Sequence, residues 1–233
     1  MDEDNLSLPN NLFISQRYEF QATRVIGQRL SPATIKIKVD FSTLDEDTDE
    51  YASRMEIALA KMAYWVEKVL NNSILIDAEN EWAIDRFIDG SVPSTTNMVV
   101  LAPEAPSDAC LAELLVCKLR AISDGAFHFH ALDIESSDGR GMGFTFVGSF
   151  PGESFPEPED WLTDHNYFTK QWWNRADAST IDVIPDEDDD LNDPPLWAYS
   201  LGFIADAVAT PPVTSVVVRP EFRPKVIEGG KVD

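Results

Sequence analysis

The stretch from Ala33 to Phe41 alternates between apolar and polar side chains. Its apolar side chains are Ile35, Ile37, Val39 and Phe41, and its charged side chains are Lys36, Lys38 and Asp40. Because successive side chains of a strand point to opposite faces, this pattern predicts a strand with one buried face and one face in water. A sheet built on such a strand has to cover its apolar face with another layer.

The remaining sequence to residue 150 supplies the elements of such a fold. The strands that we expect lie at Phe13 to Ile26, Ala33 to Phe41, Ser73 to Asp77, Met98 to Leu101, Ala126 to Glu135 and Met142 to Phe150, and the two main helices run from about Asp47 to Leu70 and from Ser107 to Asp124. One or two further helical turns are expected near Trp82. This order predicts an α+β two-layer sandwich, with a mostly antiparallel sheet and two main helices on one face.

The composition changes after residue 151, where Pro, acidic and aromatic residues become dominant. Between Glu153 and Asp193, thirteen acidic residues stand against Lys170 and Arg175. We therefore divide the chain into a flexible N-terminus of residues 1–10, a core domain of residues 11–151 and an irregular, acidic, aromatic-rich C-terminal extension of residues 152–233. The extension is expected to pack on the core or on a partner, with a helix over Trp197 to Val208 and a strand over Val213 to Val218.

The net charge of the chain limits the kinds of molecule that we expect it to bind. Eighteen Lys and Arg against 41 Asp and Glu give a net charge of −23. Such a surface repels nucleic-acid phosphates and anionic membranes, and it attracts basic proteins. We therefore expect a basic protein partner or self-assembly, without direct nucleic-acid or membrane binding. The acidic N-terminus and the lack of a long apolar run predict a cytoplasmic protein.

The extension holds the residues that best fit a binding role. Its predicted partner-binding residues are Trp161, Trp172 and Trp173 together with the acidic run Asp186, Glu187, Asp188, Asp189 and Asp190. Aromatic anchors surrounded by acids suit an apolar groove rimmed by Lys and Arg on a partner. The alternative is that these rings fasten the extension to its own domain.

The three histidines and two cysteines give little indication of a metal site or of a reactive thiol. His128 and His130 stand two apart on a predicted strand, so they would share one face and, with His165 and the Asp164 carboxylate, could hold a metal ion. That face continues as Leu132 and Ile134, which favours ordinary histidines, so no metal and no cofactor is predicted. Cys110 and Cys117 lie two turns apart on a predicted helix and are expected to be buried thiols.

These observations favour a non-enzymatic acidic interaction protein, an assembly subunit or an inhibitor, that binds a basic protein. Compact acidic proteins without enzyme motifs resemble phage-encoded virion or host-takeover proteins in composition, which would place the chain in a host cytoplasm. Three alternatives stay open. They are a metal-dependent enzyme that uses His128, His130 and His165, a DNA-mimic inhibitor of a nucleic-acid-binding protein, and a structural homo-oligomer subunit.

Overall fold

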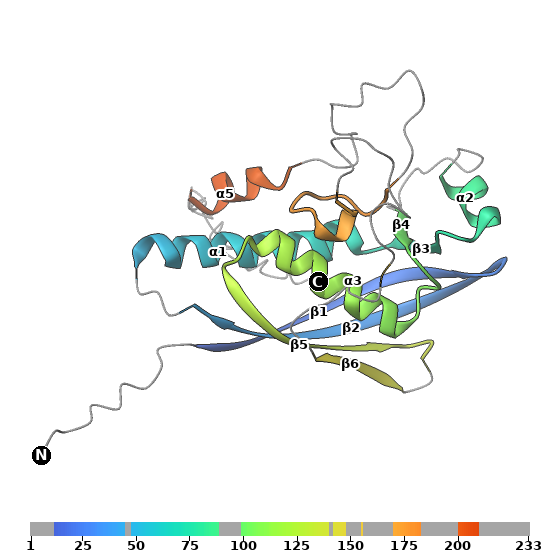
Figure 1. Cartoon of the computed structure of the whole chain (residues 1–233), viewed down its shortest axis with the longest axis horizontal. Coiled ribbons are helices and arrows are strands. Elements are labelled where there is room, and N and C mark those ends of the chain that lie inside the picture. The colour runs from blue at the N-terminus through green and yellow to red at the C-terminus, as the bar shows by residue number, and fades with distance from the viewer. Residues whose placement is uncertain are drawn as a thin grey trace, which may run out of the picture.

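The computed structural model describes residues 12–44, 48–88, 99–139, 142–147, 155, 170–182 and 200–209, and the fold is given for these residues. They form one open sheet with helices packed against it (Figure 1). The class predicted from the sequence, an α+β fold with a mostly antiparallel sheet, is confirmed.

The sheet has six strands in the order β4-β3-β1-β2-β5-β6. Its strands are β1 (Phe13–Ile26), β2 (Arg29–Thr43), β3 (Ser73–Asp77), β4 (Val99–Ala102), β5 (Phe127–Ser136) and β6 (Gly143–Val147). The β1–β2 hairpin turns at Gly27, whose φ of 60° is a conformation that glycine adopts without strain. The strands β3 and β4 run parallel to β1, and the other neighbours are antiparallel.

The alternation in β2 sets the register of the central strands. Ile37 lies opposite Tyr18 on β1 and Ile134 on β5, and it exposes only 2% of its surface. Lys36 and Lys38 point to the other face, where they pair with the carboxylates of Glu19 and Asp133. One face of the sheet is therefore apolar and covered, as the sequence predicted, and the other carries cross-strand ion pairs.

Two helices cover the apolar face. α1 (Asp49–Tyr64) begins at Thr48, whose side chain accepts a hydrogen bond from the Tyr51 backbone N–H, so the helix cap lies one residue after the predicted Asp47. The helix continues as the π-helical segment η1 (Trp65–Leu70), and a shorter helix, α2 (Glu81–Phe87), follows β3. α3 (Asp108–Ser123) is capped by Ser107 as predicted, and it ends at Asp124 in a left-handed conformation.

Part of the C-terminal extension lies on the helices and adds a partial third layer to the predicted two. The 3-10 turn η2 (Trp172–Asn174) contacts α3, and α5 (Gly202–Ala209) contacts α1 (Figure 1). The helix expected over Trp197 to Val208 is observed in its second part as α5, while Ser200 and Leu201 are not helical and Trp197 to Tyr199 lie outside the described residues. The expected strand over Val213 to Val218 falls outside the described residues.

A buried ion cluster ties the far end of the hairpin to the helix layer. Arg24 of β1 forms ion pairs with Asp108, in the first turn of α3, and with Asp138, in the turn between β5 and β6. The Ser136 hydroxyl accepts a hydrogen bond from Arg24 and donates to Asp108. Because the Arg24 side chain is only 7% exposed, this cluster fixes three elements through one buried cation.

Replacement of Arg24 tests how much this cluster contributes to the free energy of unfolding. Arg24→Met leaves two carboxylates close together without their cation, and removing one member of a buried ion pair costs about 3 to 5 kcal/mol. Urea unfolding should show that loss in the free energy of unfolding, whereas Arg29→Met, on the exposed end of the same hairpin, should change it by less than about 0.5 kcal/mol. Equal effects of the two substitutions would contradict the structural role of the cluster.

Candidate functional site

The described part of the extension that carries predicted site residues is the segment 170–182, which we call the strap. Trp172 and Trp173 follow one another at its 3-10 turn, and each exposes 1% of its surface. The Trp172 indole N–H donates to the Leu101 carbonyl oxygen at 2.8 Å, and its ring stacks with Trp65 at 6.3 Å between centroids. Trp173 packs edge-on against Phe155.

Both indoles therefore lie in the interior of their own chain. In this structure neither ring is available to a partner, so the prediction of Trp172 and Trp173 as partner contacts is replaced by the alternative, in which they fasten the extension to its domain. The physical reason is the area of two indoles, which α3 and η1 bury on this side of the core. Trp161 and the acidic run from Asp186 to Asp190 lie outside the described residues.

Lys118 of α3 is the polar centre of this contact, and its side chain is fully buried. The Nζ atom donates hydrogen bonds to the carbonyl oxygens of Trp172 and Arg175, both at 2.9 Å. It also lies 3.3 Å from the Ser179 hydroxyl and 3.5 Å from an Asp177 carboxylate oxygen. One helical side chain thus contacts four residues of the strap.

Aromatic rings and charges complete the surroundings of this ammonium group. Nζ lies 5.8 Å from the ring centroid of Trp65 and 5.7 Å from that of Trp172, which is within the range of a cation–π interaction. Arg175, also on the strap, pairs with Asp182 at 2.8 Å and lies 3.8 Å from Asp177. Neighbouring charges therefore alternate in sign along the series Lys118, Asp177, Arg175 and Asp182.

Burial shifts the proton equilibrium of Lys118. Loss of hydration lowers its pKa from 10.5 to about 7, and the Asp177 carboxylate partly opposes that shift. A neutral amine has two N–H donors, enough for the two carbonyl bonds at 2.9 Å, while an ammonium has a third that can serve Ser179 or Asp177. Both protonation states therefore hold the strap through its two carbonyl oxygens.

The strap also closes one edge of the sheet. The Leu101 backbone N–H on β4 donates to the Thr180 carbonyl oxygen at 2.9 Å, and the Thr180 hydroxyl donates to the Val99 carbonyl oxygen at 2.6 Å. An uncovered strand edge would offer these groups to another chain. The strap therefore protects β4 and occupies the surface of α3 at the same time.

The two described histidines are arranged differently from the prediction. Pairing between β2 and β5 shifts at Asp40 and Phe41, where Ala131 and then Phe129 are the partners, so His130 is an extra residue at a bulge. The bulge reverses the alternation: Phe127 and Phe129 contact Phe41, and both histidines are exposed. The expectation that they share the face of Leu132 and Ile134 was wrong.

His130 already has partners in its own chain. Its Nε2 atom lies 2.9 Å from the Ser42 hydroxyl, and its ring stacks on Phe13. His165 lies outside the described residues. Within the segments that the structure describes, no group of three His, Cys, Asp or Glu side chains is placed to hold a metal ion.

Two further observations bear on the sequence predictions. Cys110 and Cys117 are buried free thiols, as expected, and burial raises the pKa of each to about 12. Among the described helices, none combines the length and the apolar character that a membrane crossing requires.

Comparison with known proteins leaves the function open. The sequence matches no family of known proteins and no curated protein. Its structure is similar to that of the uncharacterized protein WS1659 from Wolinella succinogenes, with a TM-score of 0.43, 11% sequence identity, and coverage of 59% of this chain and 98% of that chain. A similarity of this extent does not establish a shared function.

Sequence reasoning did not single out Lys118, although a signal was present. It is a cation between Cys117 and Leu119 in a helix whose apolar residues are not confined to one stripe. A helix that is apolar on most sides is buried on most sides, so a charged residue among them calls for a buried partner. The partner lies more than fifty residues further along the chain.

The lowered pKa of Lys118 predicts a pH dependence of stability. Between pH 7 and 10.5 the unfolded state binds more protons than the folded state, so the free energy of unfolding should rise with pH through this group. Lys118→Met should remove that rise, measured as the wild-type minus variant difference from pH 7 to 8.5. The comparison stops at pH 8.5 because both thiols have raised pKa values in the folded state. Above that pH, thiol ionisation in the unfolded chain makes the free energy of unfolding fall as the pH rises. A difference that is independent of pH would contradict the shift.

The cysteines make a separate prediction about reactivity. Because both thiols are buried and their pKa values are about 12, a disulfide-exchange reagent such as DTNB should modify the native protein on the order of 100-fold more slowly than the protein in urea. Fast modification of either thiol in the native state would show that the described packing of α3 is wrong.

Proposed function

We propose that this chain is a non-enzymatic interaction protein that binds a basic protein partner through the acidic run Asp186 to Asp190 and its flanking acids. The observation that carries the proposal is the distribution of charge. The described residues hold 13 Lys and Arg against 20 Asp and Glu, a formal charge of −7. The residues outside the described segments hold 5 Lys and Arg against 21 Asp and Glu, a formal charge of −16. The electrostatic attraction of the chain for a basic surface therefore comes mainly from the residues outside the described segments.

The pairing of cations in the core supports the same proposal. On the outer face of the sheet, Lys38 forms a 2.6 Å ion pair with Asp40, and Lys36 lies near Glu19. Inside the core, the cations Arg24, Lys118 and Arg175 are buried against carboxylates of the same chain. These five cations of the core are thus already paired with acids of the core.

The strap gives the acidic run a fixed attachment. Its last described residues, Ile181 and Asp182, lie four to five positions before Asp186 in the sequence. Asp182 is held by Arg175 and by the backbone N–H of Trp172, both buried. With the strap closed, the acidic run therefore follows four positions in the sequence after a residue that is held in place, which lowers the entropy that a partner has to offset when it binds.

Charge-neutral variants of the full chain test the proposal. In the first variant, Asp186, Glu187, Asp188, Asp189 and Asp190 become Asn or Gln. In the control, five exposed acids of the described core, Glu50, Glu56, Glu79, Glu81 and Glu104, become Gln, which changes the net charge by the same amount. Pull-downs from the native cell lysate at about 50 and 500 mM salt then compare both with the wild type.

The expected result is a basic protein that the wild type and the control capture at low salt and that the first variant loses. Equal loss with both variants would mean non-specific attraction to net charge and would contradict a site at the acidic run. Binding that is unchanged between the two salt concentrations would contradict an electrostatic site. Competition by duplex DNA for the same captured protein would identify the DNA-mimic form of this function.

A further inference from the structure

We propose that the strap is a latch that opens as one unit while the sheet and the helices beneath it stay folded, and that Lys118 holds it closed. The proposal concerns residues 170–182 and their seat on α3 and β4. It stands independently of what the acidic run binds, because its evidence is confined to contacts inside the described chain.

Side chains of the strap form hydrogen bonds with the backbone of the strap itself. The Arg175 guanidinium donates to the carbonyl oxygens of Lys170 at 3.2 Å and of Ile181 at 3.1 Å, so it joins the two ends of the segment. The Asp182 carboxylate accepts from the Trp172 backbone N–H, and Asp177 accepts from the backbone N–H of Ser179. A segment with this many internal bonds moves as a unit.

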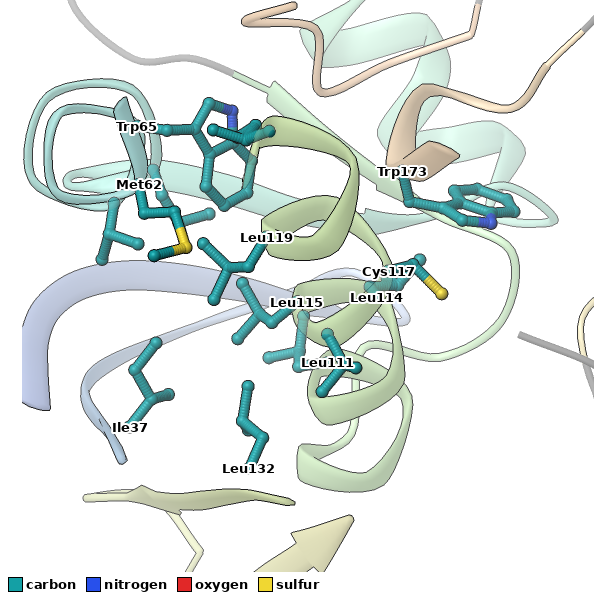
Figure 2. Packing of buried hydrophobic residues seen from close by; sticks show 14 of the residues in the cluster. Ile37, Met62, Trp65, Leu111, Leu114, Leu115, Cys117, Leu119, Leu132 and Trp173 are labelled. Atoms are coloured by element: carbon teal, nitrogen blue, oxygen red, sulfur yellow. The ribbon is translucent and has the colours of Figure 1, made fainter. Parts of the chain in front are cut away.

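The strap bonds to the core at α3 and at β4. Lys118 donates to the Trp172 and Arg175 carbonyl oxygens and contacts Ser179 and Asp177, and on β4 the Trp172 indole bonds to Leu101 and Thr180 makes two bonds. On the opposite side of α3, Leu111 and Leu115 point toward Ile37 and Leu132 of the sheet, whereas Cys117 faces Trp173 (Figure 2). The helix–sheet contact and the helix–strap contact therefore lie on different sides of α3, within one hydrophobic cluster that includes both indoles. An open strap would leave the sheet side of α3 covered.

Lys118 is the residue that couples the strap to α3. Its two 2.9 Å bonds are made to carbonyl oxygens of the η2 turn, so they depend on the position of the strap backbone and not on a strap side chain. Removing the donor leaves both buried oxygens without this partner in the closed state, while water satisfies them in the open state. Loss of Lys118 therefore shifts the equilibrium toward opening.

Hydrogen–deuterium exchange on the full chain tests the latch. In Lys118→Met, which nearly preserves the volume, two N–H groups whose hydrogen bonds cross between the strap and the core, the Leu101 amide and the Trp172 indole, should exchange on the order of tenfold faster or more than in the wild type. The amides of β1 and β2 should keep their wild-type rates. The control Lys170→Met removes an exposed charge at the start of the strap and should leave both sets unchanged.

Two outcomes would overturn the proposal. Unchanged exchange at the Leu101 amide and the Trp172 indole in Lys118→Met would mean that Lys118 does not hold the strap, and joint loss of protection at these groups and in β1 and β2 would mean that the strap is part of the global folding unit. The wild type gives an independent test at low urea concentrations. There, the Leu101 amide and the Trp172 indole should exchange through an opening of lower free energy than the one that exposes β1 and β2.

Discussion

Helix α3 is buried on two sides, and the rest of the fold follows from the need to cover both. Eleven of its residues from Cys110 to Ser123 are buried, and among them Lys118 is the one charged side chain. The sheet covers the side of Leu111 and Leu115, and the strap covers the side that includes Cys117 and Lys118. A two-layer sandwich would leave that second side in water, so part of the C-terminal extension belongs to the core.

The parts of the fold that local patterns define were predictable. Alternation in β2 gave the buried face of the sheet, and Ser107 with the Asp124-Gly125 step gave both ends of α3. The short strand β3 was predicted with its observed bounds, Ser73 to Asp77. In each case the signal lies within a few residues of the element that it specifies, so propensity and periodicity suffice.

The parts that depend on distant partners were not predictable. The bulge at His130 reverses the face of both described histidines, and it is defined by the register against Asp40 and Phe41 on another strand. By sequence alone, the indoles of Trp172 and Trp173 fit a partner's groove as well as an intramolecular one. The contacts of Trp172 with Trp65 and Lys118, and of Trp173 with Phe155, decide between the two. The partner of a buried cation is likewise a tertiary property.

Lys118 lies inside the protein with its Nζ atom bonded to the strap backbone, and the attachment of the strap to α3 depends on this contact. Nitrogen-15 NMR of the lysine side-chain amines tests it directly, with Lys118→Met to assign the signal. We expect one lysine amine that exchanges slowly with water and titrates near pH 7, apart from the other lysines. A Lys118 signal that titrates near 10.5 and exchanges as fast as those of exposed lysines would contradict it.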